Sequence, residues 1–261
     1  MSPPQKGGPT ALTREQRLGI AREIADKLRG RYQDRAKAIA LFGSVARGTD
    51  GPYSDVELFC VLVGTGIEEI IIEWSSGPWK AQVNMYSEDV ILRDAGIVDG
   101  TWPLVQSGYV YTEPLFDPDG LFASVREVAL KSANRDFGPS IRNLIVGEIW
   151  EAVGKVRNAR ERKQNALPML TVEIVKATAC LIGLSQAHMY VSNCSFLEES
   201  LELLDRPAGY DGLCKRVLSG DLGDPEGLRA YIDRLWTGIE VWAEERDIRL
   251  NDELDPLLPD V

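Results

Sequence analysis

Histidine is almost absent from this chain of 261 residues, and cysteine is scarce. The cysteines, Cys60, Cys180, Cys194 and Cys214, lie too far apart to match a zinc-binding pattern. We interpret them as reduced packing residues. His188, which ends an apolar segment, is interpreted as a packing or capping residue. A catalytic pair of cysteine and histidine is the weaker alternative.

Long apolar runs and an excess of positive charge are also missing. No apolar run reaches about 18 residues, so we expect no membrane span. The N-terminal stretch lacks the apolar core of a secretory signal, so we expect a cytoplasmic protein with loose tails at 1–12 and 250–261. The net charge is −11, with acidic residues in excess in both 1–133 and 134–261. Nucleic-acid binding needs a basic surface and is disfavoured. The acidic excess can serve solubility or attract a cationic ligand, and charge alone does not decide.

Hydrophobic periodicity divides the chain into a mixed first part and a helical second part. We therefore predict an α+β protein, with an N-terminal domain of strands and helices at 1–133 and an α-helical bundle at 134–261. We expect helices at 13–30, 87–95, 121–133, 140–162, 170–189, 196–204, 210–218 and 225–246, and strands at 38–42, 56–63, 67–75, 79–86 and 105–111. The apolar segment 170–189 is predicted to be the buried central helix of the bundle.

The stretch from Leu41 to Glu57, LFGSVARGTDGPYSDVE, combines a glycine–serine turn with a pair of carboxylates. Its flanks predict a strand, a tight turn, a short helix, a loop and a second strand. Gly43 lets a backbone approach closely, and Ser44 opens a helix whose free N–H groups can hold a phosphate. Asp55 and Glu57, two positions apart, project from one face of a strand and suit magnesium.

This combination indicates nucleotidyl transfer, which needs a held triphosphate, a metal ion and a base near the attacking hydroxyl. Arg47, one helical turn past Ser44, is placed to lie over the phosphates. Lys80, at the head of an alternating strand, can reach phosphate or be merely solvated. The competing interpretation of the whole motif is a polar turn beside a solvated strand edge. Strands of suitable length on both sides favour the functional interpretation.

A candidate for the base lies in the segment GEIWEAVGKVRN at 147–158. Glu148, Glu151 and Lys155 follow one another at i, i+3 and i+7, so they share one face of a helix. The alternative is that Glu151 and Lys155 form an ordinary surface ion pair, and spacing alone favours that alternative.

Four segments together resemble the aminoglycoside 4'-O-nucleotidyltransferases of the DNA polymerase β-like nucleotidyltransferase superfamily. They are LFGSVARGTDGPYSDVELFCVL, EWSSGPWKAQVN, VGEIWEAVGKVRN and PAGYDGLC. The resemblance runs in one order from about residue 13 to about residue 244. It implies a nucleotidyltransferase domain at 1–133 and transfer of AMP from Mg²⁺·ATP to the 4'-hydroxyl of an aminoglycoside such as kanamycin.

The resemblance also implies roles for individual residues. For the nucleotide and metal, they are Gly43, Ser44, Arg47 and Lys80 around ATP, with Asp55 and Glu57 holding Mg²⁺. Glu151 would be the general base, contributed by the partner chain of a homodimer, and Lys155 would face the α-phosphate. The aminoglycoside pocket would be formed by Glu73, Gln82, Glu148 and Glu151. An acidic pocket suits a polycationic sugar.

Two positions depart from the family pattern, because Gln82 and Gly147 stand where a glutamate is expected. Both lower the negative charge of the implied pocket. Other functions compatible with the residues are transfer to a different hydroxyl acceptor and non-catalytic binding of nucleotide or aminoglycoside.

Overall fold

A computed structural model describes residues 9–76, 79–161 and 165–251. The chain divides into two compact units. The first unit comprises Met1–Ile97 and Val105–Asn134, and the second comprises Val98–Leu104 and Arg135–Val261. Of the expected tails at 1–12 and 250–261, residues 1–8 and 252–261 lie outside the described residues.

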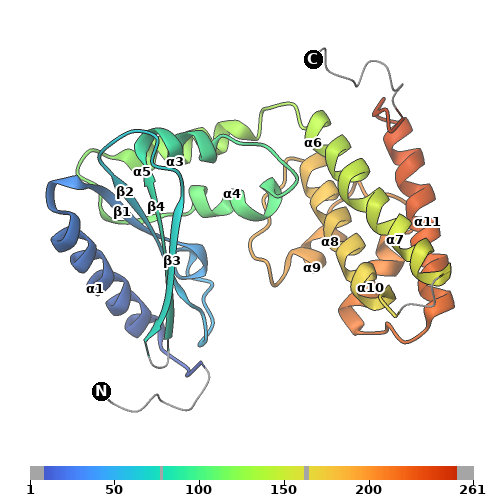
Figure 1. Ribbon diagram of the computed structural model, residues 1–261, viewed down its shortest axis with the longest axis horizontal. Helices are drawn as coiled ribbons and strands as arrows, with labels where there is room; N and C mark the ends of the chain where they lie inside the picture. The colour runs from blue at the N-terminus through green and yellow to red at the C-terminus, as the bar shows by residue number, and fades with distance from the viewer. Residues whose placement is uncertain (1–8, 77–78, 162–164, 252–261) are drawn as a thin grey trace. The chain divides into compact units, whose positions relative to one another are not determined.

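The first unit is built on a mixed sheet with the strand order β3-β4-β2-β1-β5 (Figure 1). The strands are β1 (Ala36–Phe42), β2 (Val56–Leu62), β3 (Ile70–Ser76), β4 (Trp79–Ser87) and β5 (Glu113–Phe116). β2 and β4 are parallel, whereas the β1–β2, β1–β5 and β3–β4 pairs are antiparallel. The predicted hairpin at 67–86 is confirmed as the antiparallel pair β3–β4.

Helix α1 (Arg14–Tyr32) covers one face of this sheet (Figure 1). Thr13 caps the helix in a capping box, because Gln16 N–H donates to Thr13 Oγ1 while Gln16 Oε1 accepts from Thr13 N–H. The apolar face of α1 packs on residues that alternate along the strands, such as Ile39, Leu58 and Val83. The intervening strand residues therefore project from the opposite face.

The opposite face of the sheet carries an aromatic stack. Phe59 on β2 stacks with Phe42 at a centroid distance of 3.9 Å and with Tyr109 at 5.5 Å. Phe122, on helix α5 (Leu121–Ser132), packs against Phe59 as well. Helix α3 (Glu88–Ala95) packs against α5. Phe42 is paired with Glu57 across β1 and β2, so the aromatic stack borders polar residues of the same face.

The strand predicted at 105–111 is wrong, because Trp102–Val110 forms helix α4. Pro103 suits the first turn of a helix, and buried Gln106 donates from Nε2 to the carbonyls of Ala95 and Ala129. These tertiary contacts outweigh the local alternation of apolar residues. The short edge strand β5, which contains Pro114, was not predicted.

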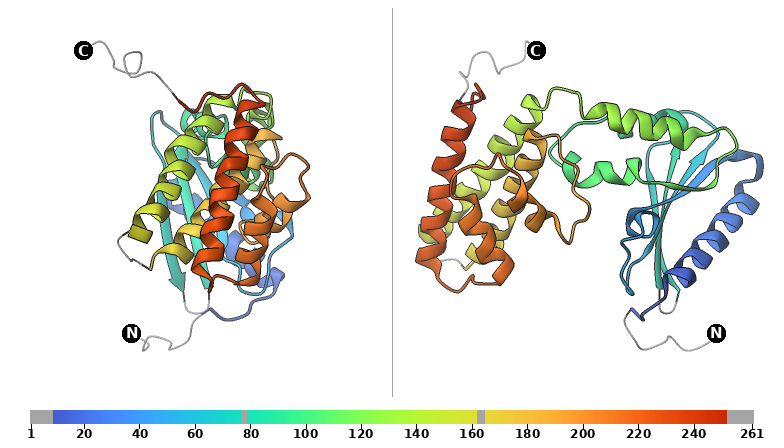
Figure 2. Two further views of the ribbon diagram at one scale, coloured as in Figure 1. Left: turned by 90° about the vertical axis from the view of Figure 1, so that its right-hand side faces the viewer. Right: turned by 180° about the vertical axis from the view of Figure 1, so that it is seen from behind.

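The second unit is helical, as expected. Its elements are α6 (Gly138–Asn143), the π-helical segment η2 (Leu144–Ile149), α7 (Trp150–Glu161), α8 (Leu167–Ser185), α9 (Phe196–Glu202), α10 (Tyr210–Ser219) and α11 (Pro225–Glu244). Figure 2 shows α7 and α11 side by side, and α8 packs against both. α8 begins at Leu167 rather than at the predicted Leu170, because Pro168 is accommodated in the first helical turn.

α8 is long and apolar enough to cross a membrane by length and composition alone. However, 72% of the relevant window is buried inside the protein, which identifies it as the core helix of the bundle. Cys60, Cys180 and Cys214 are buried and free, and Cys194 is exposed and free. Burial raises the pKa of both Cys60 and Cys180 to about 12, in keeping with inert packing residues. The His188 ring packs edge-on against Tyr190.

Candidate functional site

A row of polar side chains crosses three strands of the first unit. Strand register places Glu57 on β2 opposite Gln82 on β4, and Gln82 opposite Glu73 on β3. Residues paired in this way project from the same face of a sheet. The row lies on the face away from α1, because the neighbouring residues of β2 and β4 belong to the core under α1. Asp55 has the same alternation as Glu57 and lies just before β2.

Gly43 links this row to the end of β1. It follows Phe42 with a φ of +72°, a conformation that side chains rarely adopt. A Cβ atom at this position would lie 1.8 Å from Glu57 Oε2. The position therefore requires glycine for its backbone and for the carboxylate beside it. The short helix α2 (Gly43–Arg47) follows, so Ser44 and Arg47 begin and end one helical turn next to Glu57.

The two carboxylates form an electrostatically strained pair. Burial and the nearby charge of Asp55 raise the pKa of Glu57 to about 7, although the charges of Arg47 and Lys80 act in the opposite direction. A cation between the carboxylates would relieve this strain. Among the described residues no group of three or more acidic, histidine or cysteine side chains could hold a metal. A divalent metal here would therefore need water or phosphate oxygens, which is how Mg²⁺ is commonly bound.

Lys80 forms an ion pair with an acidic residue of the row. Its Nζ lies 2.6 Å from Glu73 Oε1 and 3.8 Å from Asp55 Oδ2. Its hydrogen bond to Glu73 is the main reason that the pKa of Lys80 is raised. Lys80 and Glu73 are both half-exposed, so this ion pair can exchange partners when a ligand arrives.

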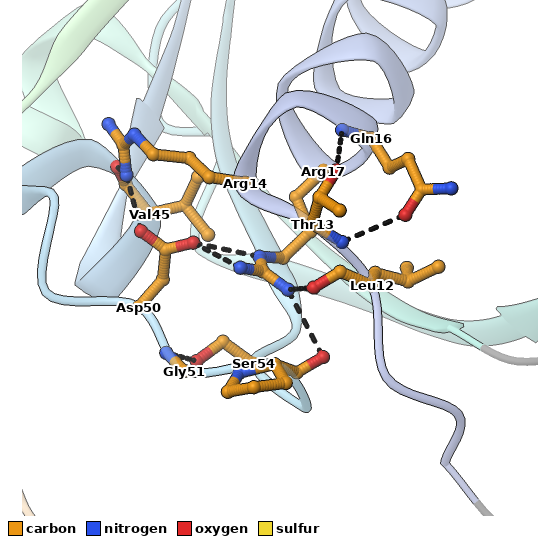
Figure 3. Close-up of polar contacts among 10 residues, drawn as sticks. Leu12, Thr13, Arg14, Gln16, Arg17, Val45, Asp50, Gly51 and Ser54 are labelled. Carbon is orange, nitrogen blue, oxygen red and sulfur yellow. Dashed lines mark hydrogen bonds and ion pairs between the residues drawn. The ribbon is translucent and has the colours of Figure 1, made fainter.

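A buried ion network fastens the loop between α2 and β2 (Figure 3). The carboxylate of Asp50 accepts hydrogen bonds from Arg17 Nε at 2.9 Å and also from Arg14. Arg17 donates further to the carbonyls of Leu12 and Pro52. Burial opposes ionisation of Asp50, but the hydrogen bonds from Arg17 and Arg14 outweigh it and hold its pKa below the ordinary value. The network fixes the segment that separates Ser44 from Asp55.

A second cluster lies in the second unit, where α7 and α8 pack together. A hollow of about 240 Å³ is lined by Gly147, Glu148, Glu151, Ala152, Lys155, Glu173 and Ala177. Glu151 Oε1 lies 2.9 Å from Lys155 Nζ, so the ion pair that the spacing predicts is present. The π-helical segment that ends at Ile149 includes Glu148, and such segments often occur at functional sites.

Comparison with known proteins assigns both units. The nucleotidyltransferase domain model matches residues 21–86, and the KNTase C-terminal domain model matches residues 119–249. Proteins named aminoglycoside nucleotidyltransferase (4') from Staphylococcus aureus and from a Bacillus species are 40% identical over 91% of this chain and 94% of theirs. The chain belongs to the aminoglycoside nucleotidyltransferase (4') family. It is accordingly a nucleotidyltransferase, and the predicted α+β fold is confirmed.

A solved structure of a nucleotidyltransferase-like protein from Exiguobacterium sibiricum 255-15 covers 86% of this chain and 75% of its own. Its TM-score of 0.48 and its 12% identity are too low to add to the assignment.

Within this family member, the two domain models cover the two clusters separately. The nucleotidyltransferase model includes the glycine turn, the carboxylate pair and Lys80. The KNTase model includes Glu148, Glu151 and Lys155. Sequence reasoning missed Asp50 and Glu173. Asp50 looked like one more turn residue, but Glu173 carried a signal as an isolated acid in the apolar segment that became α8.

Proposed function

We propose that this nucleotidyltransferase transfers AMP from ATP to the 4'-hydroxyl of an aminoglycoside such as kanamycin, releases pyrophosphate and so confers resistance. The observation that carries the proposal is the close approach of Gly43 to Glu57, whose pKa the nearby charge of Asp55 helps to raise. This proximity supports a phosphate-binding role for the turn and a metal-binding role for the two carboxylates. The names of the 40% identical relatives support the acceptor.

In this proposal the first unit binds Mg²⁺·ATP. Ser44 and Arg47 hold the triphosphate, and Asp55 and Glu57 hold Mg²⁺. Bound Mg²⁺ offsets negative charge on the phosphates. Lys80 leaves Glu73 to contact the nucleotide, and Glu73 is then free to attract an ammonium group of the sugar.

The second unit supplies the proton acceptor. The hydroxyl oxygen attacks the α-phosphorus, the bond from that phosphorus to the pyrophosphate oxygen breaks, and Glu151 takes the hydroxyl proton. Lys155, whose Nζ lies 2.9 Å from Glu151 Oε1, faces the α-phosphate. Glu148 and Glu173, which line the same hollow, hold cationic groups of the aminoglycoside. The enzyme works in the cytoplasm as a homodimer in which Glu151 of one chain serves the nucleotide bound by the other.

The test is adenylylation of kanamycin by the purified full chain, followed by mass spectrometry and pyrophosphate release. We expect a gain of one AMP on aminoglycosides with a free 4'-hydroxyl and none on those without it. Asp55→Asn and Glu151→Gln should each lower kcat by about 10²–10⁴-fold. Glu127→Gln is a matched control, because Glu127 forms an exposed i,i+4 pair with Lys131 at 2.6 Å.

The control variant should keep wild-type kcat. Transfer of AMP to a protein or nucleic-acid hydroxyl instead of kanamycin would overturn the proposed acceptor. Full activity of Glu151→Gln would overturn the proposed base.

A further inference from the structure

A chain of polar side chains runs along β4 on the face that carries the polar row. Gln82 Nε2 donates to Asn84 Oδ1 at 2.7 Å, and Asn84 Nδ2 donates to Glu69 Oε1 at 2.7 Å. The hydroxyl of Tyr86 donates to the same Glu69 oxygen. Asn84 and Tyr86 are buried, with 7% and 1% of their surface exposed. We call these four residues the Gln82 relay.

The donors and acceptors of the relay follow a fixed order, which the chemistry of its side chains determines. Burial raises the pKa of Tyr86 far above its ordinary value, so its hydroxyl keeps the proton and acts as a donor. A carboxylate only accepts, so Glu69 requires the amide nitrogen of Asn84 on its side. The oxygen of Asn84 is then turned toward Gln82, so Gln82 must donate to it from its own amide nitrogen. Each amide orientation is thus fixed by the acceptor at the end of the relay.

The consequence is an oriented acceptor in the polar row. With Nε2 of Gln82 committed to Asn84, Oε1 is turned away from Asn84, and no described residue donates to it. Strand register places Gln82 between Glu57 and Glu73. We propose that Asn84, Glu69 and Tyr86 are positioning residues that hold Gln82 Oε1 toward the acceptor substrate, where it accepts a hydrogen bond from a hydroxyl or ammonium group of the aminoglycoside. The substrate part of this inference rests on the proposed function; the orientation of the amide does not.

The relay predicts an unexpected effect of a negative charge at position 82. Simple electrostatics says that Gln82→Glu should tighten binding of a polycationic sugar. In the relay, however, a carboxylate at position 82 meets the oxygen of Asn84. Rotating Asn84 only moves the conflict to Glu69, where an amide oxygen would face a carboxylate. Gln82→Glu alone should therefore weaken the site.

Glu69→Gln removes this conflict, because it lets the relay reverse. Because Asn84 and Tyr86 both donate to Oε1 of Glu69, the new amide at position 69 would turn so that its oxygen accepts from Tyr86 and its nitrogen donates to the oxygen of Asn84. The nitrogen of Asn84 would then donate to the new carboxylate at position 82, so every donor again has an acceptor. The sign of the Gln82→Glu effect should thus depend on the residue at position 69.

The experiment is a double-mutant cycle on the full chain with Gln82→Glu, Glu69→Gln and the double variant. The readouts are KM for kanamycin, KM for ATP, kcat and the melting temperature without substrate. Glu68→Gln is the matched control, because Glu68 is adjacent but pairs with exposed Arg93 at 2.7 Å. We expect Gln82→Glu to raise KM for kanamycin by about tenfold and to lower the melting temperature by roughly 2–5 °C.

In the Glu69→Gln background, Gln82→Glu should instead lower KM for kanamycin and raise the melting temperature, while KM for ATP stays unchanged throughout. The Glu68→Gln background should not change the sign of either effect. A lower KM for kanamycin in both backgrounds, or independent effects on melting, would overturn the relay. If no form acts on aminoglycosides, the proposed function fails, and the melting cycle still decides whether the relay orients Gln82.

Discussion

The two units present acidic residues to their sites in opposite ways. In the first unit, Glu57 is half-buried against Gly43, shares its surroundings with Asp55 and has its pKa raised to about 7. In the second unit, Glu151 is 60% exposed and pairs with Lys155 one turn away on the same helix. The first carboxylate is held by the backbone of three strands and a turn. The second is held by the spacing of a helix face.

This difference indicates which task each carboxylate is suited to perform. A carboxylate whose ionised form is destabilised by burial and by a neighbouring negative charge is suited to bind a cation, because the cation offsets both effects. A solvated carboxylate on a helix face is instead accessible to the hydroxyl group of a bound substrate, whose proton it can take. The first half-site should therefore be sensitive to small changes in packing, and the second should be sensitive only in catalysis.

The largest effect should come from Gly43→Ala. The new methyl group would need a left-handed backbone and would also displace the Glu57 carboxylate that lies 1.8 Å from its position. We expect loss of nucleotidyl transfer by about 10³-fold and destabilisation of about 3 kcal/mol or more in urea unfolding. Gly66→Ala separates the two causes, because Gly66 has a φ of +68° but nothing within 4 Å of the added atom. Equal losses in the two variants would show that the Glu57 contact is unimportant.

The next effect is expected from Asp50→Asn and concerns the stability of the fold. The side chain of Arg17 is only 3% exposed, so removing the negative charge leaves a buried guanidinium without compensation. We expect a loss of about 3–5 kcal/mol in the free energy of unfolding, measured by urea denaturation. Glu151→Gln breaks an exposed ion pair and should cost less than about 0.5 kcal/mol. Similar losses for the two variants would contradict the contrast between the units.

Much of this architecture was predictable from local sequence. The capping box at Thr13, the glycine turn, the hairpin at 67–86 and the face shared by Glu148, Glu151 and Lys155 depend on residues close in the chain. The family resemblance predicted the fold and the nucleotidyltransferase activity. The individual roles of the site residues remain predictions.

What could not be predicted depends on contacts between distant segments. Helix α4 alternates like a strand, and the decisive contacts of Gln106 come from residues 11 and 23 positions away. The Asp50 network joins residues more than 30 positions apart, and nothing in the turn itself distinguishes a buried acid from a solvated one. The same holds for Gln82. From sequence alone it only lowers the negative charge of the implied pocket, and its hydrogen bond to Asn84, which in turn donates to Glu69, is visible only in the structure.

The smallest effect concerns pH and sharpens the contrast at Glu57. Its pKa is higher in the folded protein than in the unfolded chain, so the folded protein binds this proton more tightly. Stability without metal should therefore fall as pH rises from about 4.5 through 7, relative to Glu57→Gln, which has no such proton. We expect the wild-type melting temperature to drop by a few degrees against that variant between pH 5 and 8. Added Mg²⁺ should reduce the drop in the wild type alone, because a cation stabilises the ionised carboxylates that high pH produces. A melting difference that stayed constant across this range, with and without Mg²⁺, would mean that Glu57 is as well solvated as Glu151.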